Sequence, residues 1–447
     1  MKKNKWREVP GSIVAPQGFL ASGVFCDIKR LGTGKGSNKG PKRDLALLVS
    51  TAPATAAGMF TTNQICAAPV KVCVQRVRRG IAQAIVINSG NANACTGLQG
   101  FKDAFAMTTL AAQALHLPAG RVLVGSTGRI GVPLPMANVK SGIGQAARQL
   151  GSSPLHAAQA AEAIMTSDTR PKQIAVAFQL SGKRVRLGGM CKGAGMIQPG
   201  MSATGARPAA SPSALHATML CFITTDAAIS APALRVALQQ AVAHSFNRIT
   251  VDGDMSTNDT VLVLANGLAG NPPAKLRAPA SRDFVCFQAA LEHVCLALAR
   301  MIVRDGEGVH RVVTVRVSGA RNGAEADAAA RAVANSALVK TSWHGGDPNW
   351  GRIIDALGYS KARVVEEKVD IGYSAPDSRQ ILWSLRGGQP TSIRFRDLCA
   401  AAAAPEFDLH IRLNLGRASA VMYAADLTEH YVDFNKGDVS DPASLGG

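Results

Sequence analysis

The sequence predicts an α/β protein built of layered sheets and helices. Strand-like apolar runs alternate with helix-like segments along the 447 residues, and hydrophobic residues make up 47% of the chain. Aromatic residues make up only 5%, so we expect a core of small, closely packed side chains. Because sheets and helices each bury an apolar face against another element, this alternation is typical of helices packed on sheets.

The predicted strands are short runs of β-branched and other apolar residues. They are residues 84–87, 122–124, 174–180, 185–187, 219–223, 261–265, 312–317 and 409–413. The third and fourth runs are joined by Ser181, Gly182 and Lys183, which predicts a hairpin.

The predicted helices carry apolar residues at helical spacing or have high helix propensity. They are residues 103–116, 233–245, 287–303 and 324–334. The first ends before Pro118, and Pro232 stands at the start of the second, where a helix tolerates proline.

Positive charge is concentrated in the first half of the protein. The net charge is +19, but residues 1–217 contain 26 basic and 6 acidic residues, whereas residues 218–447 contain 23 and 24. Such a field favours anionic ligands, such as small carboxylates or a phosphate-bearing group. No aromatic residues are interleaved in a stacking pattern, so we do not expect nucleic-acid binding.

Neither a leader nor a membrane span is expected. The basic residues 1–7 are followed by Glu8, Pro10 and Gly11 instead of an apolar run. The long uncharged stretches 45–70 and 80–101 contain polar residues, proline or glycine, which is typical of buried strands and loops. We therefore expect a cytoplasmic protein.

Cysteine and histidine spacing predicts no metal site. The nine cysteines include no CxxC pair, which favours neither a disulfide framework nor a zinc site. The nine histidines are dispersed, and each alone is expected to be a polar surface group or a satisfied core group.

The most informative segment runs from the glycine-rich residues 193–205 to the apolar run 219–223. Between them lies a loop rich in proline, alanine and serine, which ends at Ala217 and Thr218. A threonine at the start of a buried strand is the arrangement of enzymes that cut their own chain to free an N-terminal nucleophile. The freed α-amine, with a pKa of about 7.7–8.0, is then a suitable base. The alternative is a plain loop entering a strand, in which threonine is simply a good strand former.

Longer strings resemble a known family. They are FTTN at 60–63, NSGNANACTG at 88–97, STGRIG at 126–131, MTSDTRPK at 165–172, FNRITVDGD at 246–254, STNDT at 256–260, IVRDGEG at 302–308 and DPNWGR at 347–352. The chain is similar through nearly its whole length to the ornithine acetyltransferase family, the ArgJ-type glutamate N-acetyltransferases of arginine biosynthesis.

This resemblance implies a self-processing fold of the N-terminal-nucleophile type. The chain would cut itself between Ala217 and Thr218, which gives an α chain (residues 1–217) and a β chain (residues 218–447). Thr218 would be the nucleophile, and Thr127 and Gly128 would stabilise the oxyanion. Without the family, residues 126–128 would be read as an ordinary turn.

The resemblance also implies the substrate contacts. They are Thr166, Lys192, Thr218, Glu307, Asn435 and Ser440. Lys192 would pair with a substrate carboxylate, and Glu307 with the substrate ammonium or with the Thr218 amine. Without the family, Lys192 and Glu307 would be surface charges, and Asn435 and Ser440 a frayed tail.

The reaction implied is acetyl transfer from N-acetylornithine to glutamate through acetyl-Thr218, without a metal or redox cofactor. Some family members also accept acetyl-CoA, and the basic first half does not decide between the donors. Two α and two β chains would form the assembly. The alternative is a self-processing aminopeptidase or amidase, in which water accepts the acyl group. The chain departs from the family pattern in the additional residues 202–216, which we expect to loop out before the cleavage point.

Overall fold

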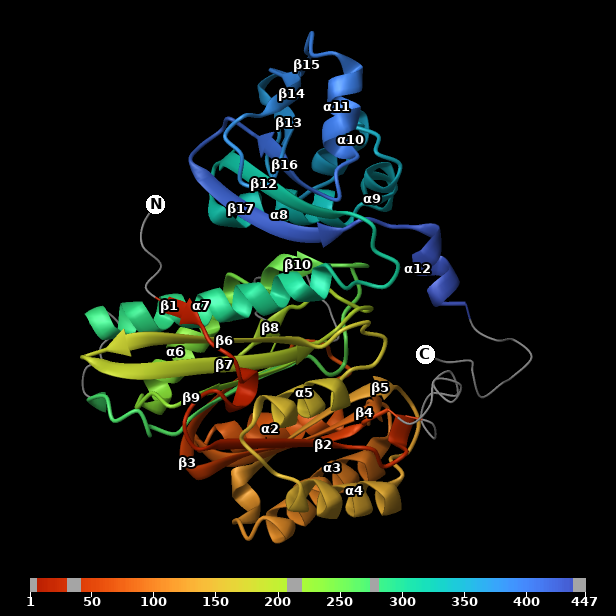
Figure 1. Cartoon of the computed structure of the whole chain (residues 1–447). Helices are drawn as coiled ribbons and strands as arrows, with labels where there is room; N and C mark the ends of the chain where they lie inside the picture. The colour runs from red at the N-terminus through yellow and green to blue at the C-terminus, as the bar shows by residue number, and fades with distance from the viewer. Residues whose placement is uncertain (1–5, 30–41, 207–218, 274–280, 437–447) are drawn as a thin grey trace.

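The computed structural model describes residues 6–29, 42–206, 219–273 and 281–436. The described strands form a ten-stranded sheet and a seven-stranded sheet, with helices packed on both (Figure 1). The expected α/β class of layered sheets and helices is confirmed.

The ten-stranded sheet has the order β1-β6-β7-β9-β11-β3-β4-β5, and β2 and β8 also pair with β3. Its strands are β1 (Trp6–Glu8), β2 (Phe19–Val24), β3 (Leu45–Thr61), β4 (Ile81–Asn91), β5 (Val122–Arg129), β6 (Lys172–Leu180), β7 (Lys183–Lys192), β8 (Met201–Ser202), β9 (Leu220–Thr225) and β11 (Thr260–Ala265).

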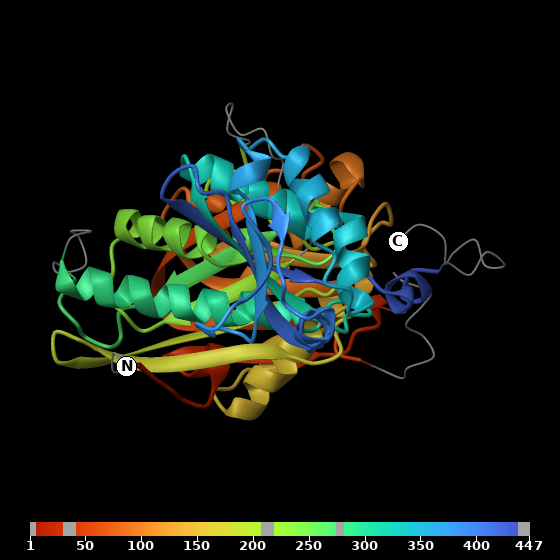
Figure 2. The same ribbon diagram turned by 90° about the horizontal axis from the view of Figure 1, so that it is seen from above.

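The seven-stranded sheet has the order β10-β17-β12-β16-β13-β14-β15. Its strands are β10 (Ile249–Thr250), β12 (Val312–Ala320), β13 (Asp370–Ser374), β14 (Leu382–Arg386), β15 (Gln389–Pro390), β16 (Glu406–Arg412) and β17 (Ala418–Ala425). It lies over α7, which crosses beneath it when the molecule is seen from above (Figure 2).

All the described α-helices except α12 contribute to one of three hydrophobic cores. The described α-helices are α2 (Ala68–Val77), α3 (Gly97–Ala114), α4 (Met136–Arg148), α5 (Pro154–Ala163), α6 (Ala231–Ala243), α7 (Arg282–Val303), α8 (Gly323–Asn335), α9 (Ala337–His344), α10 (Trp350–Gly358), α11 (Phe395–Ala402) and α12 (Glu429–Phe434). Helices α2 to α5 supply the first core, α6 and α7 the second, and α8 to α11 the third.

Strand β9 is buried on both faces. Leu220 and Phe222 belong to the first core, whereas Cys221 and Ile223 belong to the second. Successive side chains of a strand point to opposite faces, so a strand between two cores needs the continuous apolar run found in the sequence. Strand β9 pairs antiparallel with β7 and parallel with β11.

Helix α7 is the one helix in the described ranges that is long and apolar enough to cross a membrane. Its side chains Phe287, Leu291 and Leu298 are fully buried. They pack with β6, β7 and α6 in the second core, which accounts for the apolar composition of this helix.

The predicted strands and helices are all present, several of them with other bounds than predicted, and helices such as α2, α4 and α5 were not predicted. Helix α3 begins at Gly97, six residues before the first residue of the predicted helix. Strand β7 continues to Lys192. Residues 45–61, expected as strands and loops, form the single strand β3, whose pairing with β4 shifts register between Val49 and Ala54.

Candidate active site

The chain that follows the predicted cleavage point is held in the middle of the ten-stranded sheet. Ala217 and Thr218 lie outside the described residues, and so does Ser440. Met219, which is bonded to residue 218, donates its N–H to Oδ1 of Asp259 at 2.5 Å. Its carbonyl accepts the N–H of Thr260 at 3.0 Å. The backbone next to residue 218 is therefore fixed by both its donor and its acceptor.

Asp259 is a buried carboxyl directed at this junction. Its side chain is fully buried, and its Oδ2 has no hydrogen-bond partner in the described part of the chain. Burial raises the pKa of Asp259 well above its usual range, although the Met219 N–H and the Lys192 ammonium oppose this shift.

The neighbouring Asn258 connects this junction to the end of β5. Its Nδ2 donates to the Ala92 carbonyl at 2.6 Å and to the Ser126 carbonyl at 2.8 Å. The predicted oxyanion residues Thr127 and Gly128 follow Ser126 directly, and Thr127 is buried. The dipeptide 258–259 thus contacts both the strand that carries the oxyanion pair and the strand that begins after residue 218.

Gly128 occupies a position that only glycine can take. Its φ is +131°, and a Cβ there would lie 2.3 Å from the carbonyl carbon of Gly90. The lack of a side chain at residue 128 lets β4 and β5 approach closely at this point. A backbone N–H is one of the donors that an oxyanion hole uses.

A buried ion network lies where β7 ends. The Nζ of Lys172 lies 2.5 Å from Oδ1 of Asp168 and 2.5 Å from Oδ2 of Asp305. The Nζ of Lys192 lies 3.8 Å from Oδ2 of Asp168. Asp168 also accepts the N–H of Thr166 at 3.0 Å, which places this predicted substrate contact beside Lys192.

Burial and charge act in opposite directions in this network. Burial alone would disfavour ionised Asp168, but the ammonium groups of Lys192 and Lys172 outweigh it and lower its pKa to about 2. Burial lowers the pKa of Lys192, and the carboxylates of Asp168, Glu307 and Asp259 partly offset that effect. Lys192 therefore lies within the electrostatic reach of both the ion network and the Met219 junction.

Glu307 and Asn435 lie against the segment that follows β7. The Glu307 N–H donates to the Ala194 carbonyl at 2.9 Å, and a Cβ on Gly195 would lie 2.4 Å from the Glu307 carboxylate. Asn435, at the end of α12, donates its Nδ2 to Oε2 of Glu307 at 3.0 Å. Helix α12, near the end of the chain, thus lies close to the end of β7, which belongs to the first half of the chain.

The structure brings together four predicted substrate contacts, Thr166, Lys192, Glu307 and Asn435, and connects Thr127 and Gly128 to the same region through residues 258–259. Reasoning from the sequence missed the supporting residues. They are Asp168, Lys172, Asn258, Asp259 and Asp305. Each lies inside one of the sequence strings that resemble the family. Membership of these strings is the signal by which the supporting residues could have been found.

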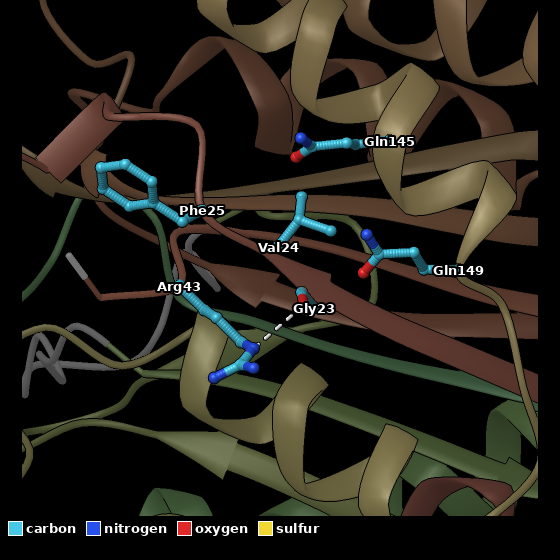
Figure 3. A pocket seen from close by; sticks show the side chains of 6 residues that line it. All are labelled: Gly23, Val24, Phe25, Arg43, Gln145 and Gln149. Carbon is cyan, nitrogen blue, oxygen red and sulfur yellow. Dashed lines mark hydrogen bonds between the residues drawn. The ribbon is translucent and has the colours of Figure 1, made fainter.

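A surface pocket of about 370 Å³ lies elsewhere, beside β2 and α4 (Figure 3). It is lined by Gly23, Val24, Phe25, Arg43, Gln145 and Gln149. The Arg43 Nε donates to the Gly23 carbonyl at 3.1 Å. None of these six residues is a predicted site residue, so the pocket is not the candidate active site.

Comparison with known proteins gives a family match over most of the chain. The ArgJ family model matches residues 22–437. The arginine biosynthesis bifunctional protein ArgJ of Symbiobacterium thermophilum is 47% identical over 427 residues, which cover 95% of this chain and 98% of that protein. The protein of the same name from Geobacter sulfurreducens is 42% identical over 419 residues, which cover 94% and 98%.

Two solved structures are also similar. The arginine biosynthesis bifunctional protein ArgJ of Bacillus halodurans is 36% identical, with a TM-score of 0.41, over 44% of this chain and 100% of that chain. Ornithine acetyltransferase of Mycobacterium tuberculosis, in complex with ornithine, is 38% identical, with a TM-score of 0.40, over 44% and 100%.

Proposed function

Because the chain belongs to the ArgJ family, we propose that it moves an acetyl group from N-acetylornithine to glutamate through an ester on Thr218. It is an acetyltransferase of arginine biosynthesis. One observation carries the assignment of the nucleophile: Met219 is anchored to buried Asp259, whose neighbour Asn258 contacts the strand of Thr127 and Gly128.

Self-cleavage would produce the nucleophile. The Thr218 hydroxyl attacks the Ala217 carbonyl, the C–N bond breaks, and an ester replaces the peptide bond. Water then cleaves the ester, which leaves a carboxylate on Ala217 and a free α-amine on Thr218. The fixed Met219 supports this step, because a held backbone on one side of the scissile bond limits the conformations that residue 218 can adopt.

Acetyl transfer would use the same hydroxyl twice. The Thr218 amine accepts the hydroxyl proton while Oγ attacks the acetyl carbonyl of N-acetylornithine. The amide C–N bond breaks, and the proton passes to the departing amine of ornithine. The glutamate amine then attacks the acetyl ester and releases Oγ. Donors from Thr127 and Gly128 would stabilise both tetrahedral intermediates, and the loss of one such donor typically costs about 10²–10³ in rate.

The charged groups suit substrates that carry a carboxylate and an ammonium. Lys192 is buried and is within reach of several carboxylates, so a substrate carboxylate would join an existing ion network. Glu307 is the partner for the distal ammonium of ornithine or for the Thr218 amine. Thr166, Asn435 and Ser440 would donate or accept hydrogen bonds with the polar groups of the substrate.

The remaining elements of the proposal follow the family. The proposed transfer uses no metal or redox cofactor. Acetyl-CoA is a second candidate donor of the acetyl group. The proposed assembly contains two α and two β chains. All nine cysteines lie in the described part of the chain and none forms a disulfide, which supports a cytoplasmic location. The alternative amidase is not favoured, since the relatives are named for arginine biosynthesis.

A coupled assay tests the proposal. Purified protein is incubated with N-acetylornithine and glutamate, and the products are separated by chromatography. We expect ornithine and N-acetylglutamate in equal amounts, and neither product from Thr218→Ala. Free acetate in place of N-acetylglutamate would support the amidase, and full activity of Thr218→Ala would exclude the proposed nucleophile.

A further inference from the structure

Two histidines and a buried aspartate meet at a place that the proposed reaction does not use. His310 precedes β12, His344 ends α9 and Asp426 follows β17. Ligand-type atoms of the three side chains all lie within 4.8 Å of one another. The His310 backbone N–H donates to Oδ1 of Asp426 at 3.0 Å, which fixes the carboxylate and leaves Oδ2 to face the rings.

Two buried polar atoms in this cluster are unsatisfied. Oδ2 of Asp426, on a side chain that is 0% exposed, has no hydrogen-bond partner among residues 6–29, 42–206, 219–273 and 281–436. The same holds for Nδ1 of His344, which lies 3.4 Å from that oxygen. In a tetrahedral site with bonds of about 2.0–2.1 Å, two ligand atoms lie about 3.4 Å apart. A bound ion would satisfy both atoms at the separation that the structure already has.

The surrounding contacts are those of a metal-binding imidazole. Nε2 of His344 lies 2.8 Å from Oε2 of Glu429, so the ring N–H opposite Nδ1 has a carboxylate partner. Such a partner fixes the tautomer and orientation of a ligating histidine. The His310 ring lies 5.0 Å from the His344 ring and 5.2 Å from the His430 ring, measured between centroids. The His310 ring therefore lies near both other histidine rings.

We propose that His310, His344 and Asp426 bind a divalent transition-metal ion such as Zn²⁺. Two imidazoles and one carboxylate are the donors that Zn²⁺ and its neighbours prefer, whereas Mg²⁺ and Ca²⁺ prefer oxygen ligands throughout. The Lys340 ammonium, which donates to the Ala425 carbonyl, repels a cation here. The two negative charges of Asp426 and Glu429 exceed this single positive charge.

The ion would hold α12 against the seven-stranded sheet. Asp426 and Glu429 flank the start of α12, and Thr428 donates its hydroxyl to the Gly308 carbonyl at 2.7 Å. The same helix ends at Asn435, which contacts Glu307 in the candidate active site. The site would thus be structural, because it fixes the helix that presents Asn435 and does not touch the reacting atoms.

Titration with Co²⁺ tests the site, because tetrahedral Co²⁺ has a characteristic visible spectrum. Full-length protein without a histidine tag is stripped with a chelator and titrated, and Zn²⁺ affinity is then measured by displacement of Co²⁺. We expect one tetrahedral ion per chain. Asp426→Asn, which preserves the shape of the side chain, and His344→Ala should remove this binding. Glu429→Gln should weaken it by about 10–100-fold.

The control is His156→Ala, since His156 hydrogen-bonds to Ser153 far from the cluster. It should bind like the unmodified protein, and circular dichroism checks that every variant is folded. The proposal is overturned if the unmodified protein binds no Co²⁺, or if Asp426→Asn binds it equally well. The three side chains then only pack against one another and bind no ion.

Discussion

Asp259 is the residue that most directly fixes the position of the backbone just after the predicted cleavage point. It accepts the Met219 N–H, and burial raises its pKa well above the usual range. A neutral acid and an amide have similar shapes and both keep an acceptor oxygen, so an amide at position 259 can still accept the Met219 N–H.

We expect Asp259→Ala to lower the free energy of unfolding by about 1–3 kcal/mol, because it leaves the buried Met219 N–H without an acceptor. It should also slow self-cleavage, whereas Asp259→Asn keeps the acceptor and most of the stability. Urea unfolding and a time course on denaturing gels measure the two effects. Equal losses in both variants would mean that the ionised carboxylate is required.

Gly128 and Gly131 allow a controlled comparison of what a Cβ does at two glycines with positive φ. Both have positive φ, +131° and +81°, but a Cβ on Gly131 meets nothing within 4 Å, whereas one on Gly128 meets the Gly90 backbone. Gly131→Ala should cost only backbone strain of about 1–2 kcal/mol. Gly128→Ala should cost about 3 kcal/mol or more and abolish transfer. Thermal unfolding and the transfer assay compare them, and similar values for both would refute the close approach seen here.

At the scale of elements, the network around Lys172 joins the start of β6 to the end of α7. Lys172 is buried between Asp168 and Asp305, and Asp305 also accepts the Thr169 N–H at 3.1 Å. Removal of one member of a buried ion network leaves an uncompensated charge in the protein interior. This network therefore stabilises the geometry around Lys192.

Lys172→Met should lower the free energy of unfolding by about 3–5 kcal/mol near pH 7. The pKa of Asp168 is about 2 in the folded protein against 3.8 ordinarily, so its stabilising contribution of about 2 kcal/mol is present above pH 3.8 and lost as the pH falls toward 2. The difference between unmodified protein and Lys172→Met should shrink over that range.

Urea unfolding at several pH values measures this difference. Lys183→Met, at the exposed start of β7 in the same hairpin, is the control and should be close to neutral throughout. A difference that stays constant down to pH 2 would show that the carboxylates do not contribute through their charge.

Among the described helices, α3, α6, α7 and α8 were predicted, because hydrophobic periodicity reports local burial. The other described helices were not predicted from the sequence. The run 219–223 read as a buried strand because β9 faces a core on each side. The early start of α3 was not predictable, since Gly97 and Gly100 are poor helix formers. Gly100 is held by Asn93, whose Nδ2 donates to the Gly100 carbonyl at 2.8 Å. The register shift in β3 likewise depends on its partner strands.

At the scale of the molecule, the predicted α and β chains interleave in one sheet. Strands β9 and β11, from the second part, lie between β7 and β3, both from the first. The first hydrophobic core also combines Phe222 and Leu262 with residues before the cleavage point. Separation of the two chains would break the sheet on both sides of this strand pair and expose two cores.

We therefore expect the cut protein to elute as one particle in size-exclusion chromatography and to unfold in a single cooperative transition. The two chains should separate only in denaturant. Two peaks in native buffer would contradict the interleaved sheet.

The site could be predicted from the sequence only through family resemblance. Thr166, Lys192, Glu307 and Asn435 are distant in the chain, and the sheet order that gathers them depends on long-range pairing that local patterns do not contain. The same reason hid the cluster of His310, His344 and Asp426, because each histidine alone gives no sign of a partner. Spacing rules detect metal sites only when the ligands lie close in sequence.

Mass spectrometry of the protein incubated with N-acetylornithine and no glutamate shows directly whether Thr218 carries the acetyl group. We expect a β chain that begins at Thr218 and carries one acetyl group on that residue, which disappears when glutamate is added. A β chain with a different first residue, or a stable acetyl group at another position, would contradict this expectation.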